Sequence, residues 1–213
     1  MVSRTHFGRA FYALSRTLSL SAVTSLTRVR HFNVPDITSL RGLLIASNHQ
    51  SYFDPVFIGI AFERPIHYLA REGLFRVPGF GWLLRAVGTH PVKQGKVDAS
   101  AIKTVLSLLR GGEALVVFPE GTRTRDGQIG ELQRGAVSMA ARCGVPLLPA
   151  CIEGAFECWP RTRMLPRPGR VAVCFGEMLW PVAGAEDALT DTLKEKMRQM
   201  QGFLRRYLGR RLP

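Results

Sequence analysis

Short apolar runs alternate with segments of helical periodicity from residue 41 to the end of the chain. The apolar runs have the length of buried strands, and they cover residues 42–47, 66–70, 89–92, 114–118, 147–152 and 171–175. The other segments repeat apolar residues every three or four positions; they cover residues 55–62, 79–87, 98–109, a stretch ending at Cys143, and 187–208. This alternation predicts an α/β fold, with a mixed or largely parallel sheet flanked by helices.

The first 35 residues follow a different pattern. Their apolar residues recur at three- and four-residue steps, and the segment contains five arginines but no Asp or Glu. An amphipathic helix of this type suits the membrane interface, and it is interrupted too often to span a bilayer. A helix packed on the domain and an organelle targeting segment are the alternatives; no secretory signal is evident. The chain thus divides into a basic interface segment, 1–35, and one domain, 36–213, that ends in a basic helix.

The excess of basic residues indicates which binding partners the protein attracts. Among 213 residues, 29 Lys and Arg stand against 16 Asp and Glu, a net charge of +13, while the hydrophobic fraction of 46% is that of a globular protein. Such a surface attracts acidic partners, which include anionic lipid, nucleic acid and an acidic carrier protein.

The four cysteines do not form a metal-binding pattern. They are Cys143, Cys151, Cys158 and Cys174, without a Cys-x-x-Cys pair and without histidines at zinc-ligand spacing. We expect small core residues in a reducing compartment, and no metal site.

The first candidate for chemistry is the turn at residues 48–54 (NHQSYFD), between a buried strand and a helix. Asp54 is expected as the N-cap of that helix, with Pro55 as its first residue. On a regular helix, His49 and Asp54 would lie about 140° apart, but a loop histidine can meet a capping carboxylate. Such a pair is a general base held in one tautomer. The alternative is a helix cap beside a loop histidine.

The second candidate is the loop that leaves the strand at residues 114–118. It reads FPEGTRTRDG from Phe118 to Gly127. Gly121 allows close approach of the backbone to a ligand, and Arg123 offers a planar fork suited to phosphate. The alternative is a solvated loop that turns at its Asp-Gly pair.

These two motifs, in this order, resemble those of the glycerolipid acyltransferase family, which 1-acyl-sn-glycerol-3-phosphate acyltransferase typifies in bacteria. A third block, residues 145–154 (VPLLPACIEG), looks like the family's last block, where a proline, here Pro149, shapes the pocket wall. The resemblance covers roughly residues 40–180 and implies the layered α/β fold of that family.

The resemblance also implies a reaction, in which an acyl group passes from acyl-CoA or acyl-carrier protein to the free hydroxyl of 1-acyl-sn-glycerol-3-phosphate, giving phosphatidic acid. His49 would take the hydroxyl proton and Asp54 would orient it, without a covalent nucleophile, cofactor or metal. Backbone N–H groups near the His49 turn are the expected oxyanion donors. The acceptor's head group would be held by Glu120, Gly121, Thr122 and Arg123, assisted by Lys93.

Lys93 is a departure from the family pattern, because members generally carry arginine there. Lysine keeps the charge but loses the bidentate fork. The acceptor could therefore be another lyso-lipid, such as lyso-ornithine lipid or another lysophospholipid.

A lysophospholipid acceptor implies docking on an anionic membrane, and we expect a peripheral enzyme on the cytoplasmic face of the inner membrane. The N-terminal helix and a C-terminal basic run are the candidate docking surfaces; the run comprises Lys194, Lys196, Arg198, Arg205, Arg206, Arg210 and Arg211. A nucleic-acid partner is not expected, because no helix-turn-helix, zinc-finger or RNA-binding aromatic signature is present. A non-catalytic basic lipid-binding module is the alternative class.

Overall fold

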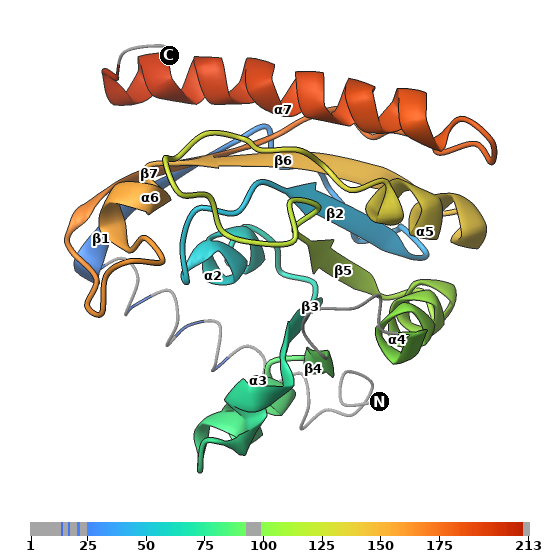
Figure 1. Ribbon diagram of the computed structural model, residues 1–213, viewed down its shortest axis with the longest axis horizontal. Helices are drawn as coiled ribbons and strands as arrows, with labels where there is room; N and C mark the ends of the chain where they lie inside the picture. Colours follow the sequence, from blue (N-terminus) through green and yellow to red (C-terminus); the bar gives the residue numbers. More distant parts are fainter. Residues whose placement is uncertain (1–13, 15–16, 18–20, 22–24, 93–98, 211–213) are drawn as a thin grey trace.

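Seven strands form one mixed sheet in the computed structural model, which describes residues 14, 17, 21, 25–92 and 99–210 (Figure 1). The strands lie in the order β1-β7-β6-β2-β5-β3-β4. Their bounds are β1 Thr27–Phe32, β2 Leu43–Ser47, β3 Ile66–Arg71, β4 Thr89–Val92, β5 Ala114–Val117, β6 Leu147–Glu153 and β7 Gly169–Phe175. Every neighbouring pair is parallel except β6 with β7. The prediction of a largely parallel α/β sheet is therefore confirmed.

Helices cover both faces of the sheet because the strand side chains alternate between two apolar cores. One core joins the sheet to α4, α5 and α7, and the other joins it to α2 and α6. Figure 1 shows α7 lying along the sheet, while η2 and α3 extend from its other side. The bounds are α2 Asp54–Gly59, η2 Glu72–Arg76, α3 Phe80–Ala86, α4 Ala99–Arg110, α5 Gly135–Cys143, α6 Ala155–Cys158 and α7 Glu186–Leu208.

The parallel register brings the two candidate loops to one edge. In β2, Ala46 pairs with Val117 of β5, and Ser47 pairs with Ala150 of β6. The loops that begin at residues 48 and 118 therefore leave adjacent strands side by side, at the carboxyl ends where α/β sheets place their ligands.

The first strand corrects the predicted boundary at residue 35. Thr27–Phe32 pairs with β7 in parallel, so these residues belong to the sheet and not to the N-terminal segment. Exposure along this segment alternates with the two-residue period of a strand, since Arg28 and Arg30 are exposed while Val29 and His31 are half-buried. Of residues 1–26, the structure describes 14, 17, 21, 25 and 26, all helical, and the membrane-interface role stays a prediction.

The cysteines behave as small core residues, as predicted. All four are free; Cys151, Cys158 and Cys174 are buried, and Cys143 is half-buried. Burial raises the pKa of the Cys158 thiol to about 11, so this sulfur stays protonated and apolar at neutral pH.

Two half-buried histidines lie against each other on the neighbouring strands β3 and β4. His67 Nδ1 lies 3.1 Å from Nε2 of His90 and 3.2 Å from the carbonyl oxygen of Gly88. Burial lowers the pKa of His67 against the opposing pull of Glu113, and burial with the neighbouring His67 lowers the pKa of His90. Protonation therefore favours the unfolded chain, in which both pKa values return to about 6.5.

We predict that the free energy of unfolding in urea is highest above pH 6.5 and falls as the pH drops through the lowered pKa values of the folded protein. The double variant His67→Gln/His90→Gln should show a smaller fall over the same range. An equal fall in the double variant would assign the acid sensitivity to other groups.

Candidate active site

The centre of the site is a buried carboxylate that holds one imidazole. Nδ1 of His49 lies 2.7 Å from Oδ2 of Asp54, whose side chain is fully buried, whereas the His49 side chain is 20% exposed. A carboxylate only accepts hydrogen bonds, so Nδ1 carries the proton and Nε2 keeps a lone pair. The ring stacks on Phe118, with the centroids 4.0 Å apart. The result is an oriented, partly exposed imidazole ring.

The Asp54 carboxylate is fixed by the loop that precedes it. Its Oδ2 also accepts the backbone N–H groups of Gln50 at 2.5 Å and Ser51 at 2.7 Å. Helix α2 begins at Asp54, the N-cap position is Phe53, and no side chain caps the helix. The predicted N-cap role of Asp54 is therefore wrong, because the carboxylate turns back to the loop instead of the helix. Its Oδ1 is buried and has no hydrogen-bond partner within the described part of the chain.

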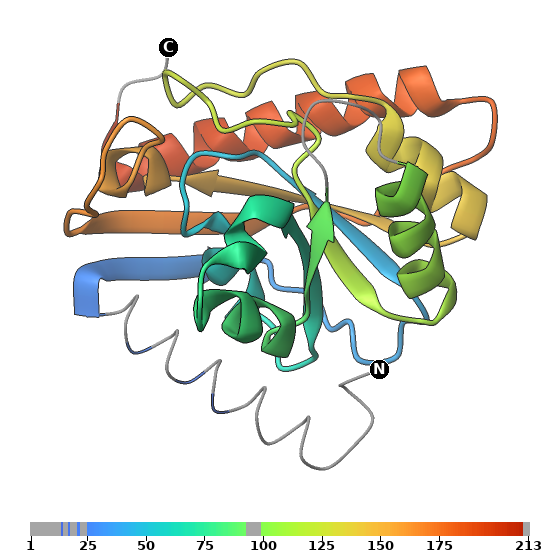
Figure 2. The same cartoon turned by 60° about the horizontal axis from the view of Figure 1, so that its bottom comes forward.

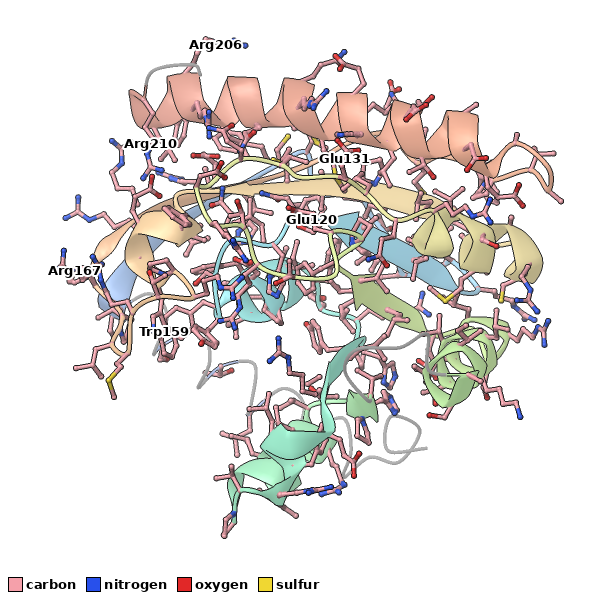
Figure 3. All side chains as sticks on the ribbon, viewed as in Figure 1. Glu120, Glu131, Trp159, Arg167, Arg206 and Arg210 are labelled. Atoms are coloured by element: carbon pink, nitrogen blue, oxygen red, sulfur yellow. The ribbon has the colours of Figure 1, made fainter. Side chains whose placement is uncertain are left out.

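Glu120 ties the second loop to the backbone of the first. Its Oε1 accepts the N–H of His49 at 2.9 Å, and its Oε2 accepts the N–H of Gly130 at 3.0 Å. On the other side, the N–H of Thr124 donates to the carbonyl of His49 at 2.7 Å. Burial raises the pKa of Glu120, and the N–H groups of Gly130 and His49 oppose this rise. Figure 3 shows Glu120 near the middle of the view, below α7. Both carboxylate oxygens thus already have partners within the protein.

These contacts bear on the expected oxyanion donors. The N–H groups of His49, Gln50 and Ser51 all donate to the carboxylates of Glu120 or Asp54. These three N–H groups already have carboxylate partners, so an oxyanion would have to be bound by other donors near the turn, and the expectation stays a prediction.

Arg123 has an unused donor beside the histidine loop. Its guanidinium carbon lies 3.5 Å above the centre of the Tyr52 ring, and its buried Nη1 has no hydrogen-bond partner among the residues that the structure describes. Trp159 supports this stack, with its centroid 4.9 Å from that of Tyr52 and 4.7 Å from that of Phe53. A buried donor of a charged group is costly when unpaired. The arrangement is suited to an anionic ligand.

The structure shows fewer contacts for the other predicted site residues. Gly121 and Thr122 are exposed in the same loop as Arg123, and Gly121 has a φ of +69° that glycine adopts without strain. Lys93 lies outside the described residues. Pro149 is buried in β6, and its ring lies near Met200 of α7, since a Cβ on Gly176 would meet both side chains. Its part in a pocket wall stays a prediction.

A buried polar network below the two loops was missed from sequence. Gln50 donates to the carbonyl of Gly127 at 3.0 Å, and Gln201 donates to both that carbonyl and Glu153 at 2.9 Å. Nε of Arg205 lies 3.4 Å from Oε1 of Glu153. One signal was present: polar residues 201 and 205 share the helical face of Met197 and Leu204, which is buried. Polar residues within an apolar stripe indicate buried partners.

Comparison with known proteins identifies the class to which this fold and site belong. The Acyltransferase family model matches residues 27–153. The chain is a member of the Acyltransferase family.

Relatives from several organisms share its length to different extents. The 1-acyl-sn-glycerol-3-phosphate acyltransferase of Bacillus subtilis is 29% identical over 83% of this chain and 89% of its own. The enzyme of that name from Pseudomonas aeruginosa is 33% identical over 68% of this chain and 55% of its own. The chloroplastic enzyme of Brassica napus is 29% identical over 74% of this chain, which spans only 46% of the plant protein.

A solved structure supports the same fold. The crystal structure of the 1-acyl-sn-glycerophosphate acyltransferase from Thermotoga maritima is 26% identical, has a TM-score of 0.77, and covers 91% of this chain and 79% of its own. Among the residues that our structure describes, none of the helices is both long and apolar enough to cross a membrane.

Proposed function

We propose that the protein transfers a fatty acyl group from acyl-CoA or acyl-carrier protein to the free hydroxyl of 1-acyl-sn-glycerol-3-phosphate, giving phosphatidic acid. The observation that carries this proposal is the 2.7 Å pair of His49 Nδ1 and the buried Asp54, which leaves Nε2 as the base. The names of the bacterial and plant relatives support the acceptor.

In this mechanism the acceptor hydroxyl attacks the thioester carbonyl carbon directly. His49 Nε2 removes the hydroxyl proton as the C–O bond forms, and Asp54 stabilises the resulting imidazolium. The tetrahedral intermediate then collapses, the C–S bond breaks, and the imidazolium returns its proton to the leaving sulfur. The histidine ends in its starting state, and no acyl-enzyme forms.

Arg123 is the proposed anchor for the acceptor phosphate. Its buried Nη1 supplies the donor. Gly121 and Thr122, which precede it in the loop, are proposed to contact the same head group, and Lys93 is the proposed second cation. Glu120 is better suited to positioning than to binding, because its oxygens hold His49 and Gly130. We propose that it fixes the histidine loop against the phosphate loop.

This assignment predicts a defined effect at Tyr52. Tyr52→Leu removes the ring on which Arg123 stacks, which is worth about 0.5–2 kcal/mol in cation–π energy. The KM for lysophosphatidate should rise about twofold to thirtyfold, with kcat little changed. Steady-state kinetics with Tyr52→Phe provides the control, since the ring remains. Equal impairment of the Phe variant would contradict the role of stacking.

The proposal is tested with a panel of acceptors. Purified protein is incubated with oleoyl-CoA, or with acyl-carrier protein as donor, and with lysophosphatidate, lyso-ornithine lipid or another lysophospholipid in mixed micelles, while thiol release is followed. We expect release that depends on lysophosphatidate. Thiol release with only another acceptor would identify that lyso-lipid as the substrate, which is the alternative that Lys93 suggests. No thiol release with any pair of donor and acceptor would favour a non-catalytic lipid-binding module.

We also propose that the protein works on the cytoplasmic face of the inner membrane as a peripheral enzyme. Much of the C-terminal basic run is less suited to docking than its sequence indicates, because Lys194, Lys196, Arg205 and Arg210 pair with acidic residues of the same chain. Figure 3 shows Arg206 on the outer side of α7, and Arg198 is also exposed. We therefore expect basic residues outside the C-terminal run to make most of the contacts with the membrane surface.

A further inference from the structure

We propose that the segment from Trp159 to Arg170, the docking loop, binds an anionic bilayer surface and holds the mouth of the active site against it. This inference rests on the proposed function, because the acceptor is a membrane lipid. The segment runs from the end of α6 into the first two residues of β7 and projects at one end of the sheet (Figures 1 and 2).

The tip of the docking loop exposes apolar side chains that the fold does not use. Met164 is 91% exposed and Leu165 is 75% exposed, the highest values among the exposed large hydrophobic residues of the described chain. Isolated exposed apolar residues are ordinary, but two adjacent ones at a loop tip form a compact element that can enter an acyl boundary.

The charged residues of the docking loop are all of one sign. Residues 159–170 contain four arginines and no Asp or Glu; the arginines are Arg161, Arg163, Arg167 and Arg170. Glu157, just before the loop, pairs with Arg210. Three of them are exposed and Arg163 is half-buried. Arginines around an apolar tip match the layered chemistry of a bilayer surface, with anionic head groups above acyl chains. Nucleic acid would match the charge but not the apolar tip.

The loop is held in shape by its own hydrogen bonds. Nε1 of Trp159 donates to the carbonyl of Arg163 at 3.1 Å, and the N–H of Arg167 donates to the carbonyl of Cys158 at 2.8 Å. Because these bonds close the base of the loop, Met164 and Leu165 are presented outward before any lipid binds. Binding then needs little ordering of the chain, which lowers its entropic cost.

The docking loop is continuous with the proposed phosphate site. Trp159 at its base contacts Tyr52, and Tyr52 stacks on Arg123. Figure 3 shows Trp159 and Arg167 on the same side of the molecule. A bilayer that receives the tip would therefore face the loops that carry His49 and Arg123, which is where a lysophospholipid must enter.

Vesicle binding by the full chain tests this inference. Co-sedimentation with phosphatidylglycerol–phosphatidylcholine vesicles should fall at least tenfold for Met164→Ser/Leu165→Ser and for Arg161→Gln/Arg167→Gln. The loss in the arginine variant should resemble the effect of high salt on the native protein. The control is Trp180→Ser/Val182→Ser, which removes side chains that are 65% and 66% exposed in the segment that leads into α7.

The outcomes separate this inference from the proposed reaction. We expect the loop variants to acylate short-chain lysophosphatidate, presented below its micelle concentration, at the native rate, and to lose activity only on vesicles. Native vesicle binding by the loop variants, or an equal loss in the control variant, would overturn the inference. A native protein that binds vesicles through the loop but acylates no acceptor would overturn the reaction alone.

Discussion

Replacing His49 by alanine is expected to lower kcat by about 10²- to 10⁴-fold, the usual contribution of a general base. The KM for each substrate should change little, because the imidazole is proposed to act on the hydroxyl proton and not to anchor either substrate. The measurement is initial-rate kinetics of thiol release with lysophosphatidate as acceptor.

A matched histidine variant separates this effect from general damage. His90→Gln removes a half-buried imidazole of β4 whose Nε2 lies 3.1 Å from Nδ1 of His67, and should keep the native kcat. His49→Ala should remain folded but unfold more easily than the native protein, because the fully buried Asp54 carboxylate loses its 2.7 Å contact with Nδ1. Near-native turnover in His49→Ala would exclude it as the base.

Arg205→Met is expected to cost about 3–5 kcal/mol of folding free energy, the range found when one partner of a buried ion pair is removed. The Arg205 side chain is 8% exposed and that of Glu153 is 4% exposed. Methionine replaces the apolar stem but leaves the Glu153 carboxylate without its most buried cation. Arg210, 3.3 Å from the same oxygen, should keep the loss toward the lower end of the range.

Chemical unfolding of two further variants tests that explanation. Arg206→Met changes the exposed neighbour on the same helix and should alter stability by no more than about 0.5 kcal/mol. Glu153→Met/Arg205→Met removes both charges and should be less destabilising than Arg205→Met. An Arg206 variant as unstable as the Arg205 variant would show that the helix, and not the buried pair, is sensitive to the change.

The sequence predicted the strands whose residues are apolar on both faces. β2 and β5 lie in the middle of the sheet, and both read as continuous apolar runs because each face meets a core. The edge strand β1 was missed for the opposite reason. Its exposed Arg28 and Arg30 interrupt the apolar pattern, and its pairing partner β7 lies at the other end of the chain.

In the candidate site, too, local contacts could be predicted from the sequence and contacts between distant segments could not. His49 and Asp54 lie five residues apart, so their pairing could be predicted from local geometry and is present in the structure. The hydrogen bonds of Glu120 could not be predicted, because its partners, the N–H groups of His49 and Gly130, depend on how two loops are packed. Hydrogen bonds between a side chain of one loop and the backbone of another leave no pattern in the sequence.

The timing of thiol release tests the direct-attack mechanism. Protein at micromolar concentration is mixed with oleoyl-CoA alone, and lysophosphatidate is added afterwards. The mechanism predicts no stoichiometric burst of thiol before the addition, and equal amounts of thiol and phosphatidic acid after it. A burst of one thiol per protein molecule, with an acylated protein, would contradict attack by a hydroxyl that His49 deprotonates.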